Sequence, residues 1–149
     1  MLRPSLIIPR IRDLCPIFAG RVAAAAGFRL CAEEDTFPAP HAFVIPVPDR
    51  GDNLEMLGPL SSIIACRVAV VVAVPNISDE PGSEAGELMI DARDELLRAL
   101  IGFTPSEGYE PITYAGVNDD LDIRRARGWV QFEFASSTDI AGLAGFQGD

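Results

Sequence analysis

Residues 62–74, SIIACRVAVVVAV, decide the fold of this chain. Every second position from Ile64 to Val74 is apolar, and the intervening positions are apolar apart from Arg67. Such a run predicts a strand of about 40 Å, at roughly 3.3 Å per residue, which is longer than most strands. Because both of its faces are apolar, we expect it at the centre of a sheet that is covered on at least one face.

Downstream of this strand, the sequence predicts a turn and then a helix from about residue 83 to residue 101. Gly102 provides a natural stop, and Pro105 prevents the helix from resuming. Acidic residues crowd the outer face, and arginines lie toward the C-terminal half, as the helix dipole favours. The apolar positions follow the i, i+3, i+4, i+7 spacing of one helix face: Ala85, Leu88, Met89, Ala92, Leu96, Leu97 and Leu100.

The last third of the chain predicts antiparallel strands. Val130, Phe132 and Phe134 alternate with other residues, so one face of their strand should be core. Asn and Asp at 118–120 are ordinary turn residues. We therefore expect strands at 111–117, 121–125 and 128–134, with a turn at 118–120, and then a small-residue tail at 136–149.

Shorter elements are predicted in the first 60 residues. A first helix would have Ile8, Ile11, Leu14 and Cys15 on one side, and Pro46 would suit an edge strand. The expected elements are a helix at 5–18, a strand at 20–25, a helix or turn at 28–36, a strand at 41–47 and a loop at 48–60. The whole chain fits an α+β fold with a mostly antiparallel sheet flanked by helices: one domain at 1–135 and a tail at 136–149, flexible or used in assembly.

The composition of the chain excludes some classes of function. The 149 residues contain 22 acidic and 12 basic side chains, which gives a net charge of −10. A domain that grips phosphates usually has the opposite sign, so binding of free nucleic acid is not expected. All basic residues are arginines, so mechanisms that need a lysine are excluded.

Candidate catalytic and metal-binding groups are few. The single histidine, His41, has no partner at metal-ligand spacing, and no GxSxG elbow presents a serine. Cys15, Cys31 and Cys66 form no CxxC pair, which indicates a reducing compartment. The N-terminus lacks an uninterrupted secretory core, so assembly in the cytoplasm is expected. We predict no catalytic residue, cofactor or metal.

Charged residues give the candidate contacts instead. A dense basic spot next to an acidic run can be a solubilising edge strand or a partner contact, and the same charges can do both. A second candidate is the 48–60 loop, whose RGD tripeptide at 50–52 is common by chance. The candidate interface residues are Arg124, Arg125, Arg127, Asp119, Asp120, Asp122, Arg50 and Asp52.

The order of these segments resembles one protein family. RIRD in the first helix, PAPHAFVIPVPDRGDN, VAVVVAVPN, DEPGSEAGELMIDARDELLRALIGFTP, PITYAGV and GWVQFEF follow one another along the chain. Over residues 5–136 this pattern resembles the tail terminator (tail completion) proteins of long-tailed bacteriophages and prophages. The most specific part runs from Val68 to Pro105.

The resemblance implies a structural virion protein. Such proteins form a hexameric ring at the head-proximal end of the tail tube, stop tube polymerisation and present a surface to the head connector. The implied partners are further copies of this chain, the tail tube protein and a connector or neck protein; DNA passes through the ring without specific binding, and no membrane is involved. Alternatives are a neck or head–tail connector protein, or a small α+β enzyme or ligand-binding domain, which would need a deep pocket with convergent polar groups.

Overall fold

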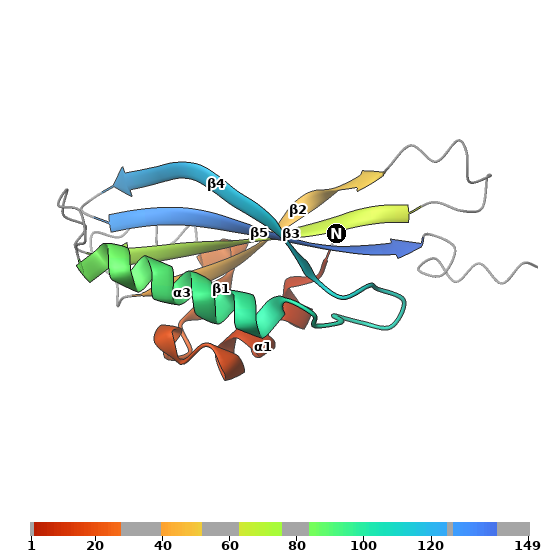
Figure 1. The fold of residues 1–149 in the computed structure, drawn as a ribbon, viewed down its shortest axis with the longest axis horizontal. Coiled ribbons are helices and arrows are strands. Elements are labelled where there is room, and N and C mark those ends of the chain that lie inside the picture. Colours follow the sequence, from red (N-terminus) through yellow and green to blue (C-terminus); the bar gives the residue numbers. More distant parts are fainter. Residues whose placement is uncertain (1, 28–39, 52–62, 76–83, 125–126, 140–149) are drawn as a thin grey trace, which may run out of the picture.

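A five-stranded sheet with helices on one face forms the fold (Figure 1). The computed structural model describes residues 2–27, 40–51, 63–75, 84–124 and 127–139. The strands are ordered β1-β2-β3-β5-β4, and only the β1–β2 pair is parallel. In chain order the elements are α1 (Pro4–Leu14), a 3-10 turn (Pro16–Phe18), β1 (Val22–Ala24), β2 (His41–Gly51), β3 (Ile63–Pro75), α3 (Glu84–Leu100), β4 (Thr113–Arg124) and β5 (Arg127–Asp139). The predicted α+β class is confirmed.

The central strand β3 lies where its sequence predicts. It pairs with β2 on one side and with β5 over its whole length on the other. Val68, Val70, Val72 and Val74 are fully buried beneath the helices. Because β3 pairs with a strand on each side and its valines are buried, it is the central strand of the sheet.

Helix α3 also matches its periodicity. Ala92, Leu96, Ala99 and Leu100 are buried against the sheet. The helix ends at Leu100, and Gly102 in the following turn has a φ of +83°, a left-handed conformation that glycine adopts at low cost. The Gly102 N–H donates to the Ile112 carbonyl at 3.0 Å, which ties the helix end to the start of β4.

The turn predicted at 118–120 is wrong. Strand β4 runs through these residues, and its register against β5 shifts between Asn118 and Asp122. Asn118 lies opposite Gln131 and Asp122 opposite Trp129, so β4 accommodates extra residues as a bulge. Asn and Asp tolerate irregular backbone in a bulge as well as in a turn, and this is why composition misplaced the reversal.

The tail also begins later than residue 136. Strand β5 continues to Asp139, and buried Ser136 and Thr138 lie within it. The Ser136 hydroxyl donates to the Glu110 carbonyl at 2.6 Å, and the Thr138 hydroxyl donates to the Gly108 carbonyl at 2.8 Å. These long-range bonds order residues that look like linker in the sequence. Residues 140–149 lie outside the described part.

The face predicted for the N-terminal helix is confirmed at Ile11 and Cys15, which are buried, and at Ile8, which packs partly buried against the core, but it is wrong at Leu14. Ile7, Ile11, Cys15 and Phe18 are fully buried, whereas Leu14 is 47% exposed. The α-helix ends at Leu14 and a 3-10 turn follows, so the chain rotates before Cys15 and Phe18 reach the core.

Strands β1 and β2 form the other side of the sheet. The strand expected at 20–25 is present as Val22–Ala24, and it pairs with residues 42–44 of β2. Pro46 lies past that pairing, on the part of β2 that pairs with β3 alone among the described strands. Residues 48–51, expected in a loop, extend β2 after a register shift between Val47 and Arg50. The predictions for 28–36 and 52–60 lie outside the described residues.

Candidate assembly interface

The charged residues singled out from the sequence lie at two opposite ends of the sheet. Arg50 in β2 pairs with Ala65 near the start of β3, whereas Arg127 in β5 pairs with Pro75 at its end. Ala65 and Pro75 are ten residue steps apart along β3, or about 33 Å. The structure therefore does not gather the six candidates that it describes into one site.

The positions of the charged candidates in β4 and β5 are set by the register of these two strands and by the bulge in β4. Arg124 in β4 lies opposite Arg127, and Asp122 lies opposite Trp129. Asp119 and Asp120 belong to the bulged stretch of β4. Asp52 and Arg125 lie outside the described residues. The backbone thus brings the described acidic positions and Arg124 of the edge strand β4 to the same end of the hairpin as Arg127 of β5.

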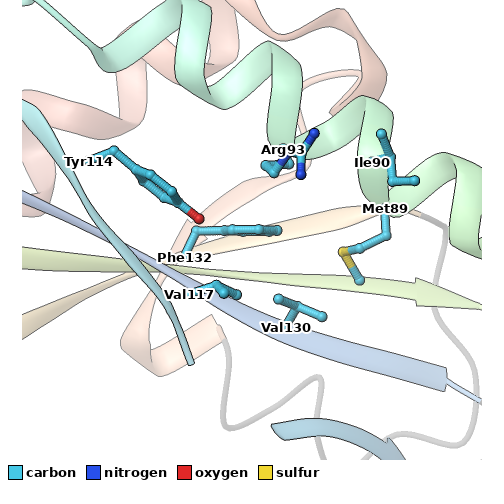
Figure 2. Close-up of a pocket in the computed structure, with 7 residues that line it drawn as sticks. All are labelled: Met89, Ile90, Arg93, Tyr114, Val117, Val130 and Phe132. Carbon is cyan, nitrogen blue, oxygen red and sulfur yellow. The ribbon is translucent and has the colours of Figure 1, made fainter. Parts of the chain in front are cut away.

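An apolar hollow, not recognised in the sequence, lies between α3 and the β4–β5 pair (Figure 2). Its volume is about 180 Å³. Helix α3 forms one wall, and the edge strand β4 forms the other. The lining residues, called here the edge hollow, are Met89, Ile90, Arg93, Tyr114, Val117, Val130 and Phe132.

Large apolar side chains of the edge hollow face solvent. Ile90 is 49% exposed, Val117 is 44% exposed and Tyr114 is 38% exposed, while Phe132 at the base is buried. Clustered apolar exposure of this kind marks an interaction surface more often than isolated exposed residues do. Ile90 lies off the core stripe of α3, so its apolar character was the one signal in the sequence that could have revealed the hollow.

Polar groups at the edge hollow are few. The Arg93 guanidinium donates to the adjacent Asp94 carboxylate at 3.0 Å, and both side chains are well exposed. Burial raises the pKa of Tyr114, and nearby Arg93 acts in the opposite direction. The Tyr114 hydroxyl therefore remains protonated at neutral pH, and Figure 2 shows it directed toward Phe132.

A second feature lies on the sheet face away from the helices. Phe43, Val71, Ala73 and Trp129 form a small buried cluster there, and the His41 ring stacks on Phe43 at 4.6 Å. On the same face Arg67 donates to Glu133, with each side chain 21% exposed. His41 is thus part of an aromatic stack, with a structural role in the sheet.

Metal binding and thiol reactivity can be judged in the described part of the chain. No group of three or more His, Cys, Asp or Glu residues that could hold a metal occurs there. Burial, assisted by Glu95, raises the pKa of Cys15 from 9.0 to about 12, so its thiol is a poor nucleophile. Within the same described residues, no helix is long and apolar enough to cross a membrane.

Among the described strands of this α+β domain, β4 pairs on one side only, and the apolar hollow lies beside that edge. Comparison with known proteins gives the family of the chain. The family described as "Phage tail terminator protein" matches residues 1–144, and the chain belongs to this family of structural phage tail proteins. The resemblance seen in the sequence is thereby confirmed.

Solved structures agree on the fold. A chain of the structure entitled "Virion of native gene transfer agent (GTA) particle" superposes with a TM-score of 0.57 at 12% sequence identity. The match covers 91% of this chain and 92% of that chain. No curated protein matches the sequence. At this identity the structural likeness establishes the common fold.

Proposed function

We propose that this protein forms a ring at the head-proximal end of a phage tail tube, ends tube polymerisation there and provides the surface to which the head joins. The observation that carries the proposal is the family match over residues 1–144. It is supported by the β4 edge, which has no second partner among the described strands, and by the apolar hollow beside it, which together offer a surface for assembly.

A ring requires two different surfaces on each copy, because each subunit meets its two neighbours through unlike patches. The sheet has unlike edges: β4 on one side, and on the other the part of β2 beyond its pairing with β1. The β4–β5 hairpin, the 48–60 segment and the residues after 136 contribute the contacts to neighbouring copies or to the tube. Six copies would close such a ring.

Charge suits the passage of DNA through this ring. Six copies, each with a net charge of −10, would carry about −60 around the opening. An acidic inner wall repels the phosphate backbone, so the genome would pass without specific binding. A ring whose inner wall is lined with arginines would contradict this part of the proposal.

The experiment that tests the function measures tube length. Purified tail tube protein is allowed to polymerise with and without this protein, and tube lengths are counted by negative-stain electron microscopy. Termination predicts that elongation stops in the presence of the protein and that a ring is visible at one tube end. Tubes of unchanged length without such rings would exclude termination.

The main alternative is a neck or head–tail connector protein of similar size. Such a protein would bind the completed tail or the head portal and leave tube elongation unaffected, so the same assay separates the two. The alternative of an enzyme or ligand-binding domain has less support, because the edge hollow is apolar and has Arg93 and Tyr114 as its polar lining side chains.

A further inference from the structure

We propose that the edge hollow receives Phe146 from the 140–149 segment of a neighbouring copy. This inference rests on the proposed ring, since it assigns one of the contacts between adjacent subunits. In this proposal the edge hollow is the binding site, called the socket below, and the 140–149 segment is the part that binds in it, called the plug below.

The size of the edge hollow fits one aromatic ring. Its volume is about 180 Å³, and an apolar cavity of roughly 150 Å³ is large enough to hold benzene. Phe132 forms the base and Val117, Val130 and Met89 form apolar walls. The walls are open at the surface, so a side chain from another molecule can enter without rearrangement of the fold.

The 140–149 segment has the matching chemistry. Its sequence, IAGLAGFQGD, places Ile140, Leu143 and Phe146 at three-residue intervals among small residues, and Phe146 is its one aromatic side chain. Its one charged side chain is Asp149, and among the described residues Arg93 is the one charged residue that lines the hollow. With Phe146 in the hollow, Asp149 is close enough in sequence to meet the Arg93 guanidinium at the rim.

Chain length favours a neighbour over the same copy. The segment leaves β5 at Asp139, and Phe132 lies seven residues back along that strand, or about 23 Å away. Phe146 is seven residues beyond Asp139, and a reversal that uses two of them leaves five, or about 17 Å. A return along its own sheet would bring Phe146 no further than the Tyr114 end of the hollow, which lies opposite Phe134.

Cross-copy disulfide formation tests the proposal directly. In a Cys31→Ser background, one protein carries Gln147→Cys, next to the retained Phe146, and a second protein carries Val117→Cys. The two are mixed under mild oxidation, and linked peptides are identified by mass spectrometry. The control replaces Val117→Cys with Ile101→Cys, which has the same 44% exposure but lies outside the hollow.

We expect the 147–117 link between copies to form at least tenfold faster than the 147–101 link. If rings form but the two rates are equal, the proposed binding of the 140–149 segment in the hollow is wrong, and the proposed ring is unaffected. If the protein stays monomeric at every concentration and no links form, both the ring and the plug are wrong. If a chain with both cysteines links only to itself, the segment occupies its own hollow and the neighbour assignment is overturned.

Substitutions provide a second measurement on assembling protein. Phe146→Ala and Val117→Arg should each raise the concentration for half-maximal assembly by about tenfold or more, as expected for a buried aromatic anchor. Ile101→Arg is the matched charge control and should leave that concentration unchanged. Equal effects of Val117→Arg and Ile101→Arg would contradict a specific socket. Circular dichroism establishes that each variant is folded.

Discussion

Three arginine side chains hold separate parts of the molecule together through backbone carbonyls. Arg10 donates to the Ala99 carbonyl at 2.7 Å, Arg12 to that of Val22 at 2.8 Å and Arg21 to that of Pro40 at 2.9 Å. The Arg10 guanidinium also lies over the Phe103 ring, 4.3 Å from its centre. A planar guanidinium can stack and donate at once, and an ammonium group cannot reproduce this geometry.

Arg10→Lys should therefore lower the free energy of unfolding by about 1–2 kcal/mol, through the weakened carbonyl bond and the lost stacking. The control is Arg98→Lys, an exposed position in the last turn of α3 where the two residues have similar helix propensity. Urea unfolding monitored by circular dichroism measures both variants. Equal stabilities for the two would show that the guanidinium geometry at Arg10 contributes nothing.

Cys15 is predicted to be inert in the folded protein. Its pKa of about 12, raised from 9.0 by burial and by Glu95, lowers the thiolate population about a thousandfold at neutral pH. Alkylation of Cys15 by iodoacetamide should be slower by at least that factor in the native protein than in urea. Peptide mapping by mass spectrometry separates this residue from Cys31 and Cys66. Comparable rates in the two states would contradict the burial of Cys15.

The raised pKa of Cys15 also makes the free energy of unfolding depend on pH. Between pH 9 and pH 12 the unfolded chain loses the Cys15 proton while the folded chain retains it. The contribution of Cys15 to stability is thus fully present below pH 9 and is lost as pH rises through about 12.

At the scale of the elements, Gly102 determines how α3 leads into β4. Gly102→Ala places a Cβ in a backbone conformation with φ of +83°, where L-residues are strained, although no atom lies within 4 Å of the added carbon. We expect a loss of about 1 kcal/mol from backbone strain alone.

Gly86→Ala provides the opposite sign as a control, because Gly86 is exposed within α3 and alanine favours helix by up to about 1 kcal/mol. Thermal unfolding of both variants checks the pair. A stabilising Gly102→Ala variant would mean that the helix ends elsewhere in solution.

The elements that sequence reasoning located best are those with long periodic patterns. Strand β3 and helix α3 have continuous apolar repeats, and their observed bounds agree with prediction to within one residue. Prediction failed where polar residues serve in strands: Asn118 to Asp122 form a bulge, and Ser136 and Thr138 bond to a distant loop. These roles depend on tertiary partners that a local pattern does not contain.

The candidate interface was harder to predict than the fold. The edge hollow forms because Ile90 of α3, Val117 of β4 and Phe132 of β5 lie close together. Their proximity depends on the order of the strands in the sheet and not on the spacing of these residues in the sequence. The charged residues were recognised from the composition of their segments. Whether they lie next to one another or far apart depends on the register of β2, β3 and β5, which the sequence pattern does not give.

At the scale of the whole molecule, the basic end of the β4–β5 hairpin is a predicted assembly contact. Replacement of Arg124, Arg125 and Arg127 with serine should disrupt assembly and leave the monomer folded, because arginine pairs with carboxylates of an acidic neighbour. Size-exclusion chromatography with circular dichroism measures both properties. The control is serine at Arg3 and Arg98, two exposed arginines of the helical layer. Assembly that is unchanged in the triple variant would refute the contact.

The most direct test of the proposed ring is the absolute mass of the purified protein, measured by light scattering with and without the tail tube protein. Negative-stain imaging of the same samples shows the shape of the particles. Rings of six copies, alone or at one end of short tubes, are the expected result. A monomer that remains a monomer in the presence of the tube would contradict the proposed function.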